Sequence, residues 1–358
     1  MRLNKAIQLK TQIVGEVSGA RKKQIYTTGL QSADTALSKR RPETRLAVGY
    51  SRLGDEPDDY ILELRVQRKG VALTTAERIA REVGGDANIE IIPEVLIQPR
   101  REIMPAARAQ QHMCQRVRPL HIGLSIGHPD GSSGTLCCFV ELANGRDALL
   151  SCNHVIALLG AVNLDDTNLI FQPGPDQKAL TTDDAIATLA DIATLSSTHP
   201  NEADSAVAEL REAVSHEGNV VPSGFQFAGR AIEIPPPGFL PLKNSPVYKL
   251  GKATGFTEGK LAGYGIDGIS VKTQTVPPRN LTFKTVMQVD WKALSAPFSS
   301  PGDSGSLLFT ESGDSLYALG MLFAGGYKVD KGAGRRQKGV SLCCDIGRIL
   351  KIHKAAWL

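Results

Sequence analysis

The sequence predicts a β-rich domain, a sandwich or barrel of short strands, preceded by a small α+β unit. After Arg118, short apolar segments recur between turns rich in glycine or proline. This spacing is typical of all-β folds and not of alternating βαβ units. Before that point, residues 45–99 carry the order strand, strand, helix, strand. With 358 residues, the chain is long enough for two or three domains.

The N-terminal part is predicted to contain three segments. Residues 1–44 form a partly ordered extension with a short helix at 30–40 (LQSADTALSKR). Residues 45–99 form the α+β unit, whose last strand, 88–99, bends at a proline. This unit contains neither cysteine nor histidine. We therefore expect it to regulate the chain or to join copies of it in a homo-oligomer. Residues 100–117 are predicted to be a linker.

Residues 118–358 form the predicted β domain. The stretch PPPGFLP has the composition of a connector and divides the domain into two halves, 118–234 and 242–346. Residues 347–358 are predicted to close the domain as a C-terminal helix. Strands are expected in HIGLSIG, GTLCCFVEL, ALLSCNHVIA, DAIATLADIATLS, ADSAVAEL, SPVYKLGKATG, GKLAGYGI, LTFKTVMQVD, GSLLFT, LYALGMLFAGG and GVSLCCDI.

Composition argues against several classes of protein. Apolar residues make up 42% of the chain and charged residues 22%, as in ordinary globular proteins. No stretch approaches the ~18 apolar residues that span a bilayer, and the basic N-terminus lacks the apolar run of a secretory signal. We expect a cytoplasmic protein without a membrane partner. The net charge is +4, and the basic clusters at 39–41 and 331–338 are short and lack aromatic residues. Nucleic acid is therefore not an expected partner.

The six cysteines predict free thiols. Cys137–Cys138 and Cys343–Cys344 are adjacent pairs, and neighbouring side chains on a strand point to opposite faces. Cys114 and Cys152 stand alone. Neither arrangement has the spacing of a metal site or of a disulfide framework. We expect no metal and no cofactor.

His154 is the candidate general base. Among the seven histidines, it is the one that follows an apolar run, ALLSC, at the point where a strand gives way to a helical turn. A serine hydroxyl becomes a good nucleophile when a base takes its proton and a third group orients that base. Asp204 lies inside an apolar strand pattern, where a carboxylate is costly unless hydrogen bonds satisfy it. Asp191, in IATLADIATLS, is the rival acid.

The candidate nucleophile lies in FSSPGDSGSLLF, residues 298–309. A turn through Gly302 and Asp303 can bring the N–H groups of Gly302 and Ser304 to one point, which would form an oxyanion hole. Gly305 would let a substrate carbonyl approach without meeting a Cβ. The tetrapeptide GDSG alone is a weak signal. With the histidine and the aspartate upstream in a β-rich chain, it predicts acyl transfer by Ser304.

These motifs together resemble those of the chymotrypsin/trypsin-like serine peptidases. The order His154, Asp204, Ser304, with steps of 50 and 100 residues, is similar to the order in that family. LLSCNHVIA, ADSAVAEL and FSSPGDSGSLLF resemble its histidine, aspartate and nucleophile motifs, and VYKLGKATGFTEGKL resembles the opening hairpin of its second barrel. The resemblance covers about 118–350. It implies two six-stranded Greek-key barrels, with a triad of these three residues and the Gly302 N–H in the cleft between them.

A narrower resemblance concerns the N-terminal unit joined to HIGLSIGHPDGSSGTLCCFVEL and ALGMLFAGG. This combination is similar to a group of intracellular trypsin-like proteins of bacteria and plants that includes the NARROW LEAF type.

The chain also departs from the family pattern. Val155 stands where secreted members carry a cysteine after the histidine. QIVGE superficially resembles the new N-terminus of activated trypsin, but it lies far too early in the chain and is interpreted as coincidence. Phe298 occupies the position that forms the base of the family's specificity pocket. With Phe323, Ala324 and Gly325 as its wall, the pocket is expected to be neutral, apolar or shallow, which argues against a basic residue at the cleavage site.

The leading hypothesis is a serine endopeptidase acting on a protein or peptide substrate. A catalytically silent protease-fold protein that binds peptides in the same cleft is the alternative, and an esterase with the same triad is a third reading. An intact triad in a protein expected to be cytoplasmic also suggests an autoinhibited enzyme, switched on by a ligand or by cleavage.

Overall fold

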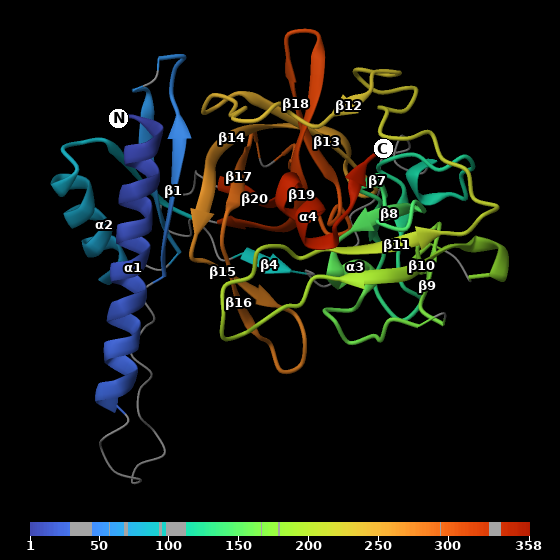
Figure 1. Cartoon of the computed structure of the whole chain (residues 1–358), viewed down its shortest axis with the longest axis horizontal. Coiled ribbons are helices and arrows are strands. Elements are labelled where there is room, and N and C mark those ends of the chain that lie inside the picture. The colour runs from blue at the N-terminus through green and yellow to red at the C-terminus, as the bar shows by residue number, and fades with distance from the viewer. Residues whose placement is uncertain are drawn as a thin grey trace.

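A computed structural model of the chain describes residues 1–28, 45–56, 58–67, 71–92, 95–97, 112–165, 167–177, 180–293, 295–328 and 338–358. A β-rich body makes up most of the molecule, and helices α1 and α2 stand together on one side of it (Figure 1). Several predicted segments lie outside the described residues, namely the helix at 30–40, linker residues 100–111 and the basic residues 39–41 and 331–337.

The second half of the β domain forms a closed six-stranded barrel. Each strand pairs antiparallel with the next, in the order β13, β14, β17, β20, β19, β18 and back to β13. The strands are β13 (Pro246–Gly251), β14 (Gly255–Asp267), β17 (Val286–Trp291), β18 (Leu307–Ser312), β19 (Ser315–Lys328) and β20 (Lys338–Asp345). A mostly-β architecture with a barrel is thus confirmed, and the pair of Greek-key barrels stays a prediction.

The first half forms a six-stranded antiparallel sheet in the order β21, β7, β8, β11, β10, β9. Its strands are β7 (Cys138–Glu141), β8 (Asp147–Ser151), β9 (Leu169–Phe171), β10 (Ala185–Ile192), β11 (Ala206–Leu210) and β21 (Ala356–Trp357). The short strands β5 (Ser125–Ile126) and β6 (Gly134–Thr135) pair separately.

The C-terminus returns to this first sheet. Helix α4 spans Ile346–His353 and ends where Lys354 takes a left-handed conformation, with φ of 50°. The two residues of β21 then pair with β7. The helix expected over 347–358 is therefore shorter, because the last residues extend the sheet instead of the helix.

Alternating apolar residues predicted most strands of the body. The expected strand LTFKTVMQVD is two strands, β16 (Asn280–Phe283) and β17, because Thr285 takes a φ of 58° between them. The short strands β9, β12 (Ile232–Glu233) and β15 (Ile269–Thr273) were not predicted from the sequence.

The N-terminal part contains α1 (Leu3–Thr28), β1 (Leu46–Arg52), β2 (Tyr60–Val66), α2 (Val71–Glu82) and β3 (Ala87–Ile91). Strand β3 pairs parallel with β2, and α2 forms the crossover between them. The long helix α1 was not predicted. In its described side chains, Leu9, Ile13 and Val17 recur every four residues and pack on the apolar core of β1, β2 and α2, which is the helical pattern that sequence reasoning overlooked.

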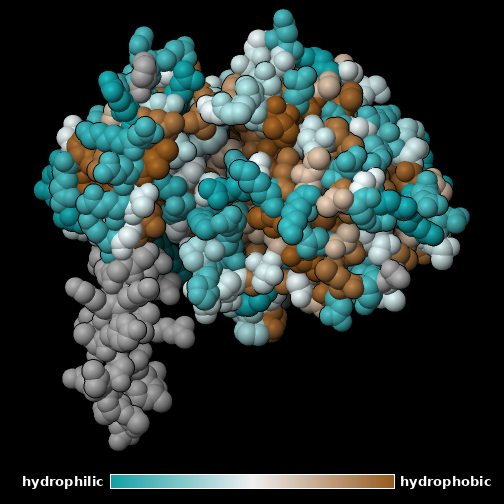
Figure 2. Space-filling view, viewed as in Figure 1, coloured by the Kyte–Doolittle hydropathy of each residue, from teal (hydrophilic) through white to brown (hydrophobic). Residues whose placement is uncertain are grey.

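Polar residues cover much of the face shown in Figure 2, and apolar residues show between the two helices of the N-terminal lobe. Within the residues described, no helix is both long and apolar enough to cross a membrane.

The N-terminal strands join the barrel directly. Strand β1 pairs antiparallel with β14, with Val48 opposite Asp267 and Tyr50 opposite Tyr264. The sheet of the α+β part and the sheet of the second barrel are therefore one continuous hydrogen-bonded sheet.

The strand expected over 88–99 is two strands that belong to different places. Strand β3 stays with β2, whereas β4 (Val95–Ile97) inserts between β15 and β19 of the second half.

A buried ionic network lies under the junction of β1 and β14. The Arg65 guanidinium and the Glu63 carboxylate are both fully buried and pair at 2.7 Å. Arg65 also donates to Gln288 Oε1 at 2.7 Å and to the Ala262 carbonyl at 2.8 Å. Lys243 reaches the other oxygen of Glu63 at 2.5 Å. Although burial alone would raise it, the pKa of Glu63 is held below its ordinary value by Arg65, Asn88 and Lys243.

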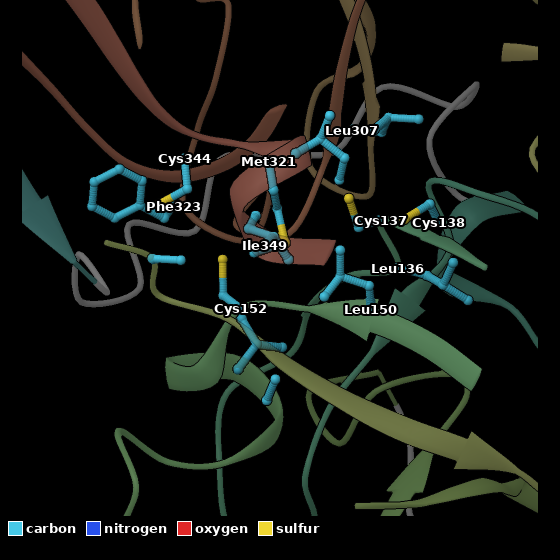
Figure 3. Close-up of a cluster of buried hydrophobic side chains, with 14 of the residues drawn as sticks. Leu136, Cys137, Cys138, Leu150, Cys152, Leu307, Met321, Phe323, Cys344 and Ile349 are labelled. Carbon is cyan, nitrogen blue, oxygen red and sulfur yellow. The ribbon is translucent and has the colours of Figure 1, made fainter. Parts of the chain in front are cut away.

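A core of apolar side chains and thiols lies between the two halves of the body (Figure 3). It joins residues of β7 and β8 to residues of β18, β19, β20 and α4, and its labelled members are Leu136, Cys137, Cys138, Leu150, Cys152, Leu307, Met321, Phe323, Cys344 and Ile349. All six cysteines are unpaired, and five are buried. Burial raises the pKa of Cys137, Cys152 and Cys344 well above the ordinary value, so these thiols stay protonated.

The buried network makes Arg65 a determinant of stability. We expect Arg65→Ala to lower the free energy of unfolding by about 3–5 kcal/mol, because Glu63 would keep its buried charge and lose its main partner. Urea denaturation followed by circular dichroism measures the loss. Arg78→Ala is the matched control, since Arg78 pairs with Glu82 on an exposed helix face, where a pair contributes about 0.5 kcal/mol or less. Equal losses in the two variants would contradict the prediction.

Candidate active site

His154 and Asp204 are in direct contact. His154 lies in α3 (Asn153–Ile156), a single helical turn after β8. Its backbone N–H donates to Oδ1 of Asp204 at 3.1 Å, and its ring Nδ1 lies 2.5 Å from Oδ2. Only 2% of the imidazole is exposed, and the carboxylate is fully buried. Two contacts to one carboxylate fix both the backbone and the ring orientation of His154.

The residue before the histidine helps to hold this turn. The Asn153 side-chain amide donates to the Ala193 carbonyl at 2.8 Å, which ties α3 to the end of β10. The sequence showed Asn153 beside His154, but the carbonyl that it binds comes from a strand forty residues later.

The rival acid Asp191 belongs to a different cluster. Its carboxylate lies 2.7 Å from Nδ1 of His353, and Nε2 of His353 lies 2.9 Å from the hydroxyl of Ser205. Ser205 is fully buried and follows Asp204 directly. This second serine, histidine and aspartate set joins α4 to β10 and to the start of β11. Because its hydroxyl is inaccessible, it positions the segment of Asp204.

Two consecutive tight turns, 300–303 and 303–306, share Asp303, and Ser304 is the second residue of the second turn. Asp303 N–H donates to the Ser300 carbonyl at 3.0 Å, and Gly302, the third residue of that turn, has a φ of 100°. Ser306 N–H donates to the Asp303 carbonyl at 2.9 Å, and Gly305, third in the second turn, has a φ of 96°. Proline second and glycine third are the residues that a type II turn requires. The two turns together place Ser304 at a corner of the chain.

Gly305 makes a close approach within the chain itself, in addition to the approach of a substrate carbonyl that stays a prediction. A Cβ at this position would lie 2.1 Å from the Thr135 carbonyl oxygen and 2.5 Å from Ser151 Oγ. The close approach is to the chain's own first half, so the glycine allows the nucleophile turn to pack against β6 and β8.

Asp303 anchors both turns. Its carboxylate is fully buried and accepts hydrogen bonds from the N–H groups of Ala253, Thr254 and Ser300 and from the Thr254 hydroxyl, at 2.7–3.1 Å. The buried Lys249 ammonium lies 3.4 Å away. Burial lowers the pKa of Lys249, and Asp303 opposes that shift. The positive charge beside Asp303 is therefore the side chain of Lys249. The segment QIVGE, which resembles an activated N-terminus, lies inside helix α1 and does not supply that charge.

The N–H groups of Gly302 and Ser304 differ from their neighbours. The N–H groups of Asp303, Gly305 and Ser306 donate to backbone carbonyls. In the part of the chain that the structure describes, no acceptor contacts the N–H of Gly302 or of Ser304. The oxyanion hole assigned to these two groups stays a prediction.

Thr135 joins the nucleophile loop to the first half, and sequence reasoning missed it. Its N–H donates to the Ser304 carbonyl and its hydroxyl to the Gly302 carbonyl, both at 2.8 Å. Its own carbonyl accepts from the Ser151 hydroxyl at 2.8 Å. A threonine in a β-strand is ordinary, so only its position between the halves gives it this role.

A second link runs through one carbonyl of β19. The Leu322 carbonyl accepts from the Gly305 N–H at 2.7 Å and from the Cys152 thiol at 3.2 Å. Gly305 follows Ser304, and Cys152 lies two residues before His154. The nucleophile turn and the histidine turn are thus fixed to the same atom.

The predicted pocket residues lie in two different apolar clusters. Phe298 is 1% exposed and packs with Val289, Leu308 and Leu322. Phe323, fully buried, and Ala324 belong to the core between the halves. Gly325 is half-buried. The assignment of these four residues to a specificity pocket stays a prediction.

Cys152, His154 and Asp204 also place a sulfur, a nitrogen and an oxygen within 4.8 Å of one another. A metal would need the thiolate. The Cys152 thiol is instead protonated and donates to Leu322, and His154 Nδ1 is held by Asp204. The cluster is better suited to proton transfer than to metal binding.

No protein-family model and no curated protein matches the chain. Among solved structures, it is similar to a glutamic acid specific serine protease that uses a histidine triad in substrate binding, with 14% identity over 67% of this chain and 100% of that chain and a TM-score of 0.42. It is also similar to protease A of Thermobifida fusca, with 12% identity over 66% of this chain and 97% of that chain and a TM-score of 0.42. A chymotrypsin of Cellulomonas bogoriensis has 17% identity over 66% of this chain and 97% of that chain, with a TM-score of 0.40.

These neighbours are chymotrypsin/trypsin-like serine proteases. The narrower resemblance to intracellular bacterial and plant proteins stays a prediction.

Lys249 should be essential to the nucleophile loop. We expect Lys249→Met to lower the free energy of unfolding by about 3–5 kcal/mol, because Asp303 would remain as an uncompensated buried charge. Urea denaturation of the wild type and of Lys249→Met measures this difference in the free energy of unfolding. Lys292→Met, which breaks the exposed pair with Glu258, should cost under about 1 kcal/mol. A Lys249→Met variant as stable as that control would contradict the role.

His353 should make stability depend on pH. Burial lowers the pKa of His353, although Asp191 opposes the shift. As pH falls below about 6.5, the unfolded chain binds a proton at this histidine while the folded chain does not, so stability falls. We expect His353→Gln to flatten this part of the stability profile, measured by melting temperature between pH 7.5 and 5. His199→Gln, at an exposed histidine, should leave the slope unchanged. A wild-type slope retained in His353→Gln would contradict the prediction.

Proposed function

We propose that the chain is a serine endopeptidase that hydrolyses peptide bonds through an acyl-enzyme. The observation that carries the proposal is the His154–Asp204 pair, which is fixed by two hydrogen bonds. The Leu322 carbonyl and Thr135 hold the turn of Ser304 against the half of the β domain that contains this pair. A base oriented by a buried acid, and a serine at the corner of a glycine-rich turn that is held by the same Leu322 carbonyl as the segment before the base, have the chemistry of nucleophilic acyl transfer.

Each residue has a separate role in the proposed reaction. Nε2 of His154 takes the proton of the Ser304 hydroxyl as the oxygen attacks the substrate carbonyl, and later returns it to the leaving amine. Asp204 keeps the other ring nitrogen, Nδ1, protonated and stabilises the imidazolium that forms. The N–H groups of Gly302 and Ser304 stabilise the negative oxygen of the tetrahedral intermediate.

The substrate is proposed to be a protein or peptide. Phe298 and Phe323, the residues predicted to form the base and part of the wall of the specificity pocket, are buried aromatic side chains and themselves offer no anionic group to a lysine or arginine side chain. A peptide-binding protein without catalysis is the alternative, and reactivity of the Ser304 hydroxyl separates the two.

Ser304→Ala tests the proposal. We expect the folded wild type to be labelled by a small alkyl fluorophosphonate, and Ser304→Ala to be unlabelled with hydrolysis reduced roughly 10⁴-fold or more. Ser300→Ala, in the same loop, should retain labelling. Intact-mass measurement of the labelled chain gives the result. A folded wild type that stays unlabelled would contradict the proposed activity.

A further inference from the structure

Strand β19 passes directly beside the nucleophile. The Leu322 N–H donates to the Ser306 carbonyl at 2.9 Å, and its carbonyl accepts from Gly305. The pairing of β19 with β18 ends at Met321, whereas the pairing of β19 with β20 continues from Ala324 to Lys328, so the β18 side of residues 323–325 is an edge. Residues 323–325 thus lead away from Ser304 along a strand edge. Such an edge is where an extended peptide adds as a further strand.

That edge is already paired with a segment of the chain's own N-terminal part. Strand β4 lies antiparallel to β19, with Leu96 opposite Gly325. On its other side, β4 runs parallel to β15, with Val95 opposite Val271 and Ile97 opposite Thr273. Figure 1 shows β4 beside β15 inside the body, away from the helices of the lobe to which its sequence belongs.

The side chains of β4 alternate between a buried and a half-buried face, as those of a peptide added to a sheet edge do. Val95 and Ile97 alternate onto one face and are both fully buried. They join the apolar core that includes Phe323 and Ala324, two of the residues predicted to line the specificity pocket. Leu96, on the opposite face, is half-buried.

The chain on both sides of residues 98–111 borders the nucleophile loop. Upstream, β4 pairs at Gly325. Downstream, the Cys114 thiol lies 3.8 Å from the Lys252 carbonyl. The Lys252 side chain in turn covers Gly302, where a Cβ would lie 2.5 Å from its Cε. The described end at β4 therefore meets β19 at Gly325, which lies against Ser299, and the end at Cys114 meets Lys252, which lies against Gly302.

We propose that β4 is an internal peptide that occupies the substrate-binding edge of β19 and inhibits the enzyme until it leaves. The proposal rests on the proposed peptidase function and adds its regulation and substrate class. The substrate is an extended segment of an unfolded or loosely folded protein, with aliphatic side chains two residues apart. Because β4 is tethered, its effective concentration at the edge is on the order of millimolar. Hydrolysis of protein substrates is then reduced to the level set by the fraction of molecules in which β4 has left the edge of β19.

Leu96→Pro tests the proposal in the full-length protein. Proline removes the N–H of the residue opposite Gly325 and leaves Val95 and Ile97 in place. We expect hydrolysis of fluorescein-labelled casein to rise at least tenfold. Labelling by a small alkyl fluorophosphonate, which needs no strand edge, should change less than threefold. Ile89→Pro is the matched control, in β3 of the same N-terminal part, and should leave casein hydrolysis unchanged.

Peptide binding separates this inference from the catalytic proposal. In a Ser304→Ala background, a fluoresceinated Glu-Val-Leu-Ile-Gln peptide should bind Leu96→Pro at least tenfold more tightly than the parent, as measured by anisotropy. Binding without labelling of Ser304 in any variant would support the inference and contradict the peptidase. Equal casein hydrolysis and equal peptide binding with and without Leu96→Pro would overturn the inference. If Leu96→Pro fails to fold by circular dichroism, Ile97→Ala replaces it, with the same expected directions.

Discussion

The buried carboxylate of Asp303 is the interaction on which the candidate site depends. It sits between two turns, accepts from three backbone N–H groups, and has a buried ammonium, Lys249, beside it. An anion in such surroundings is stable only when its partners keep their places, because an unpaired buried charge is costly. The same contacts that stabilise Asp303 therefore set the backbone path of Gly302 and Ser304 on either side of it.

The rest of the site is assembled by packing of the two halves. The core of thiols and apolar side chains shown in Figure 3 brings β8 against β19 and β20. Thr135 and the Leu322 carbonyl then transmit that packing to the turn of Ser304 and the turn of His154. No single element contains the site, so its geometry is a property of the whole β domain.

Local sequence patterns predicted those features that depend on neighbouring residues, such as individual strands. Alternating apolar residues indicated most strands, and an acid within an apolar pattern pointed to Asp204 with Asp191 as its rival; it is Asp204 that contacts His154. Features that depend on distant partners could not be predicted. Nothing in the sequence of Thr135, His353 or Val95–Ile97 indicates which residues, between 16 and 229 positions away, each will meet. Helix α1 was missed although Leu9, Ile13 and Val17 have helical spacing, because polar residues surround them in the sequence.

The continuity of β1 with β14 and of β4 with β19 has a practical consequence for anyone dividing this chain. A fragment beginning near residue 118 would keep every element of the β domain but lose the strands that cover two of its edges. Uncovered edges present rows of unsatisfied N–H and C=O groups and recruit other chains. Such a fragment would also leave Gln288 without Arg65, its buried partner. The boundary visible in the sequence is therefore a poor place to cut, and the cooperative folding unit extends back to the first strand.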